Sequence, residues 1–519
     1  MLLLLGALSL YSCQDPSRGT GIVTIDPDGG DGGDDVRIPD YPDDYSEIAS
    51  WGDRGKWNLA NVHDPSVAYY DGYYYMYCTD ASYGNEHLKA TSGVHFQGRR
   101  SKDLVNWTYV PGPMNDAPEW VSDKLDEIRS GMGLDPIPEE SLNYGYWAPV
   151  VRTVTVEGRT VLRMYYCIVI NNSIKTGASG GFDGSWTERA FIGMCESTDP
   201  ADGVWEDKGY VVCSSSDKGP DGWARRSESY WEDAYFYYNA IEPSYYVDEN
   251  SGRHYLVYGS WHSGFALLEL DPVSGKPLVE PGDPWADSPG ELSQRFGKRI
   301  ATRNAASRWQ GSEAPELIYK DGYYYLFMAY DALEVPYNTR VVRSENIEGP
   351  YYDITGRDCS AGQGDWFYAS QARLPAGVNG NQHSNALMMG HVRRLVWCPS
   401  SPSELDDLWP VALPERYAGL PGTKVTRDEL VGVWEHIDLG YDYGVQRSSE
   451  ELSLKEDGTM AGALEGSWSY DEQSGYLTLG DSIVCVEREA DWEASPRRKT
   501  IVYAGIGSDP RVTPSGARR

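Results

Sequence analysis

The sequence is poor in basic residues for its length. Its 45 Lys and Arg residues stand against 78 Asp and Glu residues, which gives a formal net charge of −33 at pH 7. This balance argues against nucleic acids and anionic membrane surfaces as partners held by charge. We therefore expect no nucleic-acid partner, and a neutral substrate is the more natural expectation.

Cysteines are also scarce. The chain has eight, and those after Cys13 form no CxxC pair and show no metal-like spacing. The scatter argues against both a zinc site and a dense disulfide framework. Several lie in strand-like runs, so we expect small buried hydrophobic residues at these seven positions: Cys78, Cys167, Cys195, Cys213, Cys359, Cys398 and Cys485.

Long apolar runs are absent except for a short one at the N-terminus, "MLLLLGALSLYSC". It is too short to span a bilayer and is typical of a secretory signal. Its end resembles a bacterial lipobox, in which Cys13 is lipidated, although no Lys or Arg precedes the run. We expect a lipoprotein signal peptide over residues 1–18 and a secreted protein anchored by lipid to the bacterial outer membrane or cell surface. The alternative is an ordinary signal followed by a free Cys13.

Residues 19–48 are rich in Gly, Asp and Pro and contain few residues that could build a core. This composition predicts an extended tether. Membrane contact is then expected only through the lipid anchor, and the chain is expected to be a monomer.

Four proline-containing segments recur between residues 49 and 422: "HDPSV", "WAPVV", "IEPSY" and "EAPEL". Each precedes a tight turn and an aromatic strand, as in "YYDGYYYMY" and "YKDGYYYLF". Asp-Gly and Ser-Gly pairs between apolar runs indicate β-hairpins. Each unit is therefore expected to open with a strand, turn tightly and return.

The repeat length predicts the architecture. Units of about 70 to 95 residues, each with four strand candidates, fit the blades of a β-propeller. A degenerate fifth unit is expected to begin within residues 381–399. Helical periodicity is almost absent, apart from "DKLDEIRSG".

Residues 423–519 have a different character, because polar and apolar residues alternate between Gly-containing turns. This pattern predicts a separate small antiparallel β-barrel or sandwich. The last residues, "DPRVTPSGARR", are expected to form a frayed tail.

In a propeller the first strand of each blade lines the axis, so the proline segments should converge. Three of them offer a carboxylate, Asp64, Glu242 and Glu313, while Trp147 and His383 hold roughly matching places. Glycoside hydrolysis needs one carboxylic acid to protonate the leaving oxygen and one carboxylate to activate water or attack carbon. The structural alternative is coincidence, since acids often precede proline at strand entrances and the chain has 78 of them.

Six ordered segments carry a resemblance to a known family: "VHDPSVAYYDGYYYMY", "RRSKDLVNW", "YWAPVV", "AIEPSYYVDENSGRHYLVYGSW", "SEAPELIYKDGYYYLF" and "YNTRVVRSENIEGPYYD". Together they resemble glycoside hydrolase family 43, and the last two resemble its endo-α-1,5-L-arabinanase branch. The C-terminal part is similar to the small β domain of extracellular arabinanases. The resemblance implies a five-bladed propeller that hydrolyses arabinan or arabino-oligosaccharide with inversion.

The resemblance also implies roles for the acids. Asp64 would be the general base that activates water, Glu313 the general acid, and Glu242 a pKa modulator that orients Glu313. The family normally has Asp at the place of Glu242. The added methylene means that either the backbone compensates or activity is altered, because catalytic geometry tolerates a displacement of only about 0.5 Å.

Other residues match the family less specifically. His383 resembles the histidine that reaches an axial metal ion, usually calcium, which is the expected cofactor. His63 and Trp147 are candidates for the sugar-binding wall, and Trp51 is a candidate for either that wall or the core. Asn338 matches an arabinanase-like segment, but no role follows from its chemistry.

Two rival functions remain open at this point. One is exo-acting α-L-arabinofuranosidase or β-xylosidase activity within the same family, decided by whether loops block one end of the cleft. The other is a carbohydrate-binding propeller with impaired catalysis, as the replacement at Glu242 suggests. Retention of both Asp64 and Glu313 speaks against the second.

Overall fold

The computed structural model of the chain is all-β, with five antiparallel sheets ahead of a closed barrel. It describes the following residues: 38–39, 51–80, 95–131, 135–170, 190–215, 238–261, 263–282, 284, 295–303, 311–331, 337–362, 367–371, 389–442, 445 and 447–519. The proposed signal peptide and almost all of the proposed tether lie outside these residues.

Four sheets have four strands each, in simple sequential order. The first is β1 (Ser66–Tyr70), β2 (Tyr73–Tyr77), β3 (Gly98–Ser101) and β4 (Thr108–Val110). The second is β5 (Tyr144–Val156), β6 (Arg159–Ile170), β7 (Ala190–Asp199) and β8 (Val204–Cys213). The third is β9 (Ser244–Val247), β10 (His254–Tyr258), β11 (Phe265–Leu270) and β12 (Lys298–Ala301). The fourth is β13 (Ser312–Lys320), β14 (Tyr323–Tyr330), β15 (Asn338–Ser344) and β16 (Phe367–Gln371).

The predicted opening hairpins are confirmed. Strand β1 pairs with β2, with Tyr70 opposite Tyr73 across the Asp71-Gly72 turn. Both turn residues have positive φ, 46° and 82°, which Asp and Gly accept more readily than other residues. Strands β13 and β14 repeat this arrangement around Asp321-Gly322.

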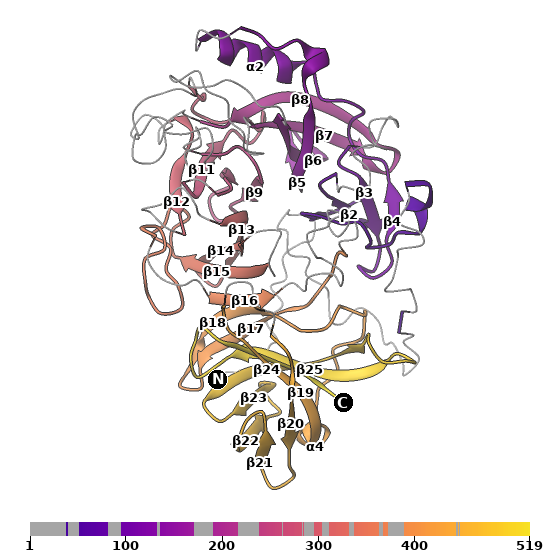
Figure 1. The fold of residues 1–519 in the computed structure, drawn as a ribbon, viewed down its shortest axis with the longest axis vertical. Helices are drawn as coiled ribbons and strands as arrows, with labels where there is room; N and C mark the ends of the chain where they lie inside the picture. The colour runs from indigo at the N-terminus through magenta and orange to yellow at the C-terminus, as the bar shows by residue number, and fades with distance from the viewer. Residues whose placement is uncertain are drawn as a thin grey trace.

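These sheets form the blades of a propeller-like arrangement. The first strands lie against one another, β1 against β5, β5 against β9 and β9 against β13, and Figure 1 shows the sheets arranged around a common centre in the upper part of the molecule. A two-stranded sheet follows, β17 (Leu395–Ser401) and β18 (Glu404–Ala412). The described residues thus establish four blades, and the fifth stays a prediction.

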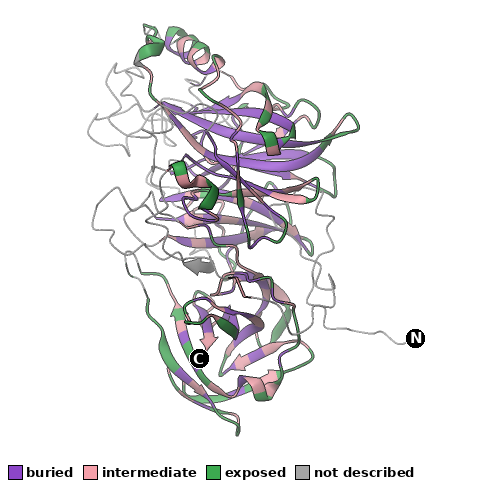
Figure 2. Ribbon diagram, turned by 90° about the vertical axis from the view of Figure 1, so that its right-hand side faces the viewer, coloured by how far each residue is buried: buried purple, intermediate pink, exposed green. Residues whose placement is uncertain are grey.

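The blades are held together by apolar layers between neighbouring sheets. One cluster contains Ala68, Leu162 and Leu256 and so joins the first three blades, while a second contains Val257 and Leu326 and joins the third to the fourth. Figure 2 shows buried residues along the strands and exposed residues mainly at the turns. Burial of this apolar surface is what fixes the inner strands relative to one another.

Helices are few among the described residues. The helix expected around residues 123–131 is confirmed as α2 (Trp120–Gly131), which buries Val121, Leu125 and Ile128 on one side. The other helical segments are short: η3 (Trp51–Lys56), η4 (Glu139–Ser141), η5 (Pro200–Asp202) and α4 (Arg427–Leu430). None of the helices in the described part of the chain is both long and apolar enough to cross a membrane.

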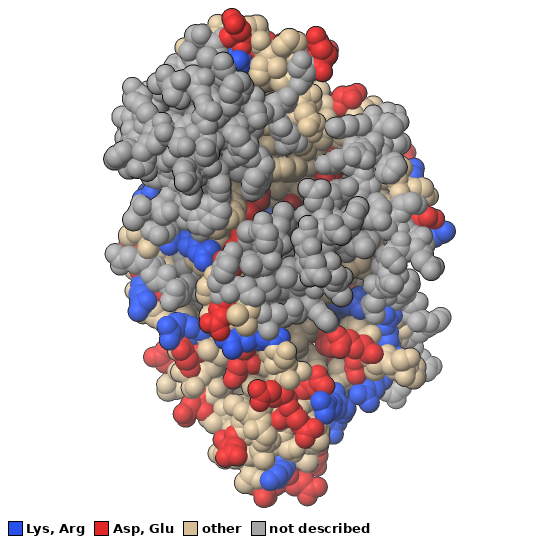
Figure 3. All heavy atoms as spheres, viewed as in Figure 1, with Lys and Arg blue, Asp and Glu red and all other residues tan. Residues whose placement is uncertain are grey.

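The C-terminal sheet closes on itself as an eight-stranded barrel, as expected for one of the two predicted forms. Its strands are β19 (Gly432–Leu439), β20 (Glu450–Leu454), β21 (Thr459–Gly462), β22 (Gly466–Asp471), β23 (Tyr476–Leu479), β24 (Ser482–Asp491), β25 (Arg498–Ile506) and β26 (Thr513–Arg518). Trp434, Leu477 and Tyr503 are buried among its apolar residues. Figure 3 shows acidic and basic side chains intermingled over this part of the surface.

The expected frayed tail is wrong. Strand β26 lies between β19 and β25 and closes the barrel, with Gly516 paired to both His436 and Tyr503. A Cβ at Gly516 would lie 2.4 Å from the Tyr503 ring, so the glycine is what lets the ring pack there. Pro and Gly made the segment resemble a tail, whereas pairing on both sides orders it.

The barrel packs directly on the two-stranded sheet, with β17 against β24 and β25. Val396, Trp409, Val502 and Ile506 share one apolar cluster across this junction. The Cys398 thiol donates to the carbonyl of Ala504, at 3.2 Å. All seven cysteines after Cys13 are buried free thiols, as predicted.

Candidate active site

A backbone kink recurs at the entrance of the first strand of each blade. Four residues directly before a proline have positive φ: Asp64 (44°), Ala148 (41°), Glu242 (56°) and Ala314 (54°). Positive φ is uncommon for residues other than glycine, and a residue before proline normally has extended backbone. Four equivalent kinks in four blades show that the propeller imposes this conformation on its central entrances.

The acids occupy two different places relative to the kink. Asp64 and Glu242 are themselves the kinked residues, whereas Glu313 precedes the kinked residue Ala314 and so matches the place of Trp147 in the second blade. Strands β5 and β13 are bulged at the same place, between Trp147 and Val150 and between Glu313 and Glu316, so the offset lies in which position carries the acid. The three acids therefore reach the centre from non-equivalent backbone positions.

The structure brings the three acids together. Burial is the main cause that raises the pKa of Glu242 well above its usual range, and the charges of Glu313 and Asp64 raise it further. The pKa of the Tyr337 phenol is also raised, first by burial and then by the same three carboxylates. Residues from three blades thus form one electrostatically coupled carboxyl cluster.

Asp64 is held by a neighbour from its own blade. The Thr79 hydroxyl donates to Asp64 Oδ2 at 2.6 Å and accepts the backbone N–H of Ala148, also at 2.6 Å. One hydroxyl therefore connects the exposed Asp64 carboxylate to the kink of the next blade. This arrangement restricts the Asp64 side chain while leaving its other oxygen without a bond to Thr79.

Glu242 makes the corresponding contact directly. Its Oε2 accepts the backbone N–H of Ala314 at 2.5 Å. Gly259 donates its backbone N–H to the carbonyl of Ile241, as Thr79 donates its own to that of His63, but Gly259 has no hydroxyl to offer. A Cβ at Gly259 would lie 2.3 Å from the carbonyl oxygen of Gly264, so no side chain fits.

Glu313 is bound from the third blade and by a phenol. The indole N–H of Trp261 donates to Glu313 Oε2 at 3.0 Å. The Tyr337 side chain also hydrogen-bonds to Glu313, and its raised pKa keeps the phenol protonated as the donor. Two donors from different segments therefore set the orientation of this carboxyl group.

The proposed wall residues lie next to the acids in sequence and in the fold. His63 is partly exposed, and its backbone carbonyl accepts the N–H of Thr79 at 3.1 Å. Trp147 is also partly exposed and packs with one side on the core of the first blades. Contact of either residue with a sugar stays a prediction.

Two other residues belong to structural networks. Trp51 packs edge-on against Trp57 and Tyr109, at 5.7 and 5.8 Å between ring centroids, which favours the core role left open for it. Asn338 is buried and donates to Asp331 at 3.2 Å. His383 lies outside the described residues, among which no three His, Cys, Asp or Glu side chains gather as metal ligands.

Comparison with known families agrees with this geometry. Residues 59–365, more than half of the chain, match glycosyl hydrolases family 43. The chain belongs to glycosyl hydrolase family 43. Residues 414–513 match a C-terminal lipocalin-like domain of that family, in the part that forms most of the barrel. The predicted family and glycosidase class are thereby confirmed.

Relatives within family 43 have similar sequences. An extracellular endo-α-(1→5)-L-arabinanase of Thermotoga petrophila is 27% identical over 494 residues, covering 86% of this chain and 92% of the relative. Extracellular endo-α-(1→5)-L-arabinanase 1 of Bacillus subtilis is 31% identical over 338 residues, covering 63% of this chain and 80% of the relative. A crystal structure of endo-1,5-α-L-arabinanase from Thermotoga petrophila shares the fold, with 21% identity and a TM-score of 0.58, covering 89% of this chain and 99% of that one.

Sequence reasoning missed the residues that hold the family 43 acids in place. Thr79, Trp261 and Tyr337 contact acids that are 15, 52 and 24 positions away in the chain. Trp261 and Tyr337 did carry a signal, since "YGSW" and "YNTR" lie in or beside the family-like segments. Thr79 carried none, because a threonine after a tyrosine strand is typical of strand ends in general.

Proposed function

We propose that this family 43 protein is an inverting glycosidase that cleaves internal α-1,5-L-arabinofuranosidic bonds of arabinan. The observation that supports this most is the meeting of Asp64, Glu242 and Glu313 at three central strand entrances. The names of the sequence relatives support arabinan as the substrate. The intermingled surface charge and Tyr-rich composition suit a neutral polysaccharide.

In the proposed reaction Glu313 donates a proton to the glycosidic oxygen. Asp64 accepts a proton from a water molecule, whose oxygen attacks the anomeric carbon from the opposite side. The electrons of the carbon–oxygen bond leave with the protonated oxygen, so one water is consumed and two new chain ends form, one of them reducing. For this geometry the two carboxyl groups should lie roughly 6.5 to 9.5 Å apart.

The proposed part of Glu242 is to hold and tune the acid. Its carboxylate binds the N–H of Ala314, so it fixes the backbone that follows Glu313. Burial, followed by repulsion from Glu313 and Asp64, raises the pKa of Glu242, and the cluster therefore retains a proton that isolated carboxyls would lose. A retained proton is what a general acid needs near neutral pH.

Hydrolysis of linear arabinan tests this proposal. We expect wild type to lower the viscosity quickly while releasing few reducing ends, and Asp64→Asn and Glu313→Gln each to lose turnover by 10³-fold or more. NMR of the first product should show an inverted anomeric configuration. Release of arabinose alone would favour exo action, and binding of arabino-oligosaccharide without hydrolysis would favour a carbohydrate-binding propeller.

Three further expectations complete the proposal: a fifth blade built around β17 and β18, an axial calcium ion reached by His383, and export with Cys13 as the lipid anchor. The calcium proposal rests on the resemblance of "NQHSN" to the family histidine, and no step of the reaction is routed through the ion. Metal analysis of purified protein, with and without His383→Ala, tests it. Fatty-acid labelling of wild type and Cys13→Ala tests the anchor.

A further inference from the structure

A layer of polar side chains follows the three acids, two or three residues further along the same inner segments. Ser66 and Ser244 stand two residues after Asp64 and Glu242, just past the proline kinks, and open strands β1 and β9. Glu316 stands three residues after Glu313, and the bulge between them keeps these two side chains on one strand face, with Ala329 and Phe327 as their pairing partners. Each strand that holds an acid thus contributes one polar residue to this layer.

Arg152 of β5 connects the members of the layer. Its side chain is 2% exposed. One guanidinium nitrogen, Nη1, donates to Ser66 Oγ at 3.2 Å and to the carbonyl of Val151 at 2.7 Å. The other, Nη2, forms an ion pair with Glu316 Oε1.

The layer joins all four inner strands. Ser66 Oγ also accepts the N–H of Val151 at 3.0 Å, and Ser244 Oγ donates to the second oxygen of Glu316 at 3.0 Å. A continuous set of contacts therefore runs from β1 through Arg152 of β5 and Glu316 of β13 to β9. Within the described part of the chain, the hydrogen bonds of Arg152 go to Ser66, Val151 and Glu316 and not to the three acids, so any influence on those acids passes through the strands.

We propose that the Arg152–Glu316 ion pair is a positioning element that fixes the strands of the three acids at their working separation. The inference rests on the proposed glycosidase function. The planar guanidinium meets three acceptors at once, which a lysine ammonium on a flexible chain does not reproduce with the same geometry. Because catalytic groups must be held within about 0.5 Å, a small relaxation of β1 against β13 lowers the rate while leaving the outer sugar contacts intact.

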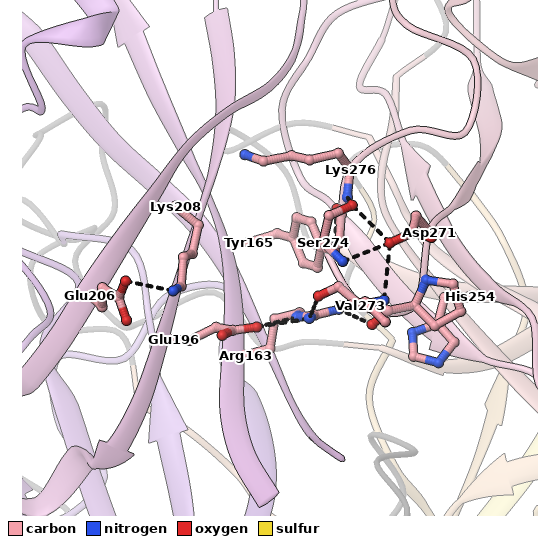
Figure 4. A network of polar contacts seen from close by, with 12 residues as sticks. Arg163, Tyr165, Glu196, Glu206, Lys208, His254, Asp271, Val273, Ser274 and Lys276 are labelled. Atoms are coloured by element: carbon pink, nitrogen blue, oxygen red, sulfur yellow. Dashed lines mark hydrogen bonds and ion pairs between the residues drawn. The ribbon is translucent and has the colours of Figure 1, made fainter. Parts of the chain in front are cut away.

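The kinetic test compares Arg152→Met and Arg152→Lys with a matched control. Arg163→Met breaks another buried ion pair, with Glu196 of β7 at 2.8 Å, where Arg163 also donates to the carbonyls of Pro272 and Val273 (Figure 4). At a temperature well below unfolding, we expect Arg152→Met to lower kcat more than tenfold with KM changed less than twofold. Arg152→Lys should recover part of kcat, and Arg163→Met should lower only the melting temperature.

A second readout needs no catalysis. The Trp261 indole N–H donates to Glu313, so its ¹⁵N-indole NMR signal, assigned with Trp261→Phe, reports on the acid. Arg152→Met should move this signal and Arg163→Met should not. If the wild type fails to hydrolyse arabinan, the proposed function is wrong. The Trp261 signal then still tests whether Arg152 positions Glu313. An unmoved signal together with an unchanged kcat in folded Arg152→Lys or Arg152→Met overturns the inference.

Discussion

The Glu242 carboxylate accepts the backbone N–H of Ala314, the residue directly after Glu313, at 2.5 Å. One hydrogen bond between a side chain and the backbone thus links two neighbouring blades, although its partners are 72 positions apart in the sequence. The extra methylene of Glu relative to Asp is what gives this side chain its reach. We therefore expect the Glu at this place, where the family resemblance implies Asp, to serve this contact.

We expect Glu242→Asp to lower kcat about tenfold. The carboxyl group would be withdrawn by about 1.5 Å, one carbon–carbon bond, and a typical hydrogen bond contributes about 0.5 to 1.5 kcal/mol, the upper end of which corresponds to about tenfold in rate. Initial rates on linear arabinan measure the change. A variant as active as wild type, or more active, would show that the longer side chain is a handicap.

Glu242→Gln should raise the melting temperature at neutral pH although it removes activity. The folded protein keeps Glu242 protonated at pH values where the unfolded chain, with a pKa of about 4.3, has lost the proton. The free energy of unfolding therefore falls as the pH rises from about 4.3 towards the raised pKa. The fall is at most about 1.4 kcal/mol per pKa unit, because the group is partly exposed.

Melting curves of wild type and Glu242→Gln from pH 4 to 8 test this sign. The two temperatures should coincide near pH 4 and separate by a few degrees at pH 7. Glu348→Gln, at an exposed residue paired with Lys298, is the control and should change little. A wild type that is the more stable of the two at pH 7 would refute the assignment.

Thr79→Val should lower kcat about tenfold, because valine has the same shape but neither binds Asp64 nor accepts the N–H of Ala148. Thr79→Ser keeps the hydroxyl and should recover much of the rate. Thr153→Val is the matched control, since Thr153 also joins the first two blades, through the carbonyl of Tyr69, without contacting an acid. Equal losses in Thr79→Val and Thr153→Val would point to blade packing alone.

The junction with the barrel should lose stability as the pH rises. Burial raises the pKa of Glu489 to about 7, outweighing its 2.6 Å contact with Arg394, and burial raises that of Glu415 to about 7 as well. Both carboxyl groups therefore stay protonated in the folded state between about pH 4.5 and 7, where the unfolded chain loses these protons. The free energy of unfolding falls as the pH rises through this range. Calorimetry should show a smaller decline over this range in Glu489→Gln than in wild type, and an identical decline would contradict the interpretation.

Local rules predicted much of the fold. The Asp71-Gly72 and Asp321-Gly322 turns follow from the φ values that these residue types accept, and each fixes the register of its hairpin. The alternation of polar and apolar residues, which is also a local pattern, predicted the C-terminal sheet. The tail at Thr513–Arg518 was misread because its order comes from two partner strands distant in sequence.

The acids could be predicted from the sequence, but the residues that hold them in place could not. A carboxylate beside a proline is visible in sequence, as Asp64 and Glu242 show. The Trp261–Glu313 and Arg152–Glu316 contacts, by contrast, join residues 52 and 164 positions apart. Such pairings are decided by how the blades close around a centre, which no local pattern specifies.

The shared apolar cluster at β17, β24 and β25 bears on how this chain can be divided. The two family matches end and begin on either side of β17 and β18, at residues 365 and 414, and so would divide the chain into two modules. Cutting the chain near residue 414 would expose Val396 and Trp409 on one piece and Val502 and Ile506 on the other. We therefore expect the propeller and the barrel to fold stably only when they are expressed together.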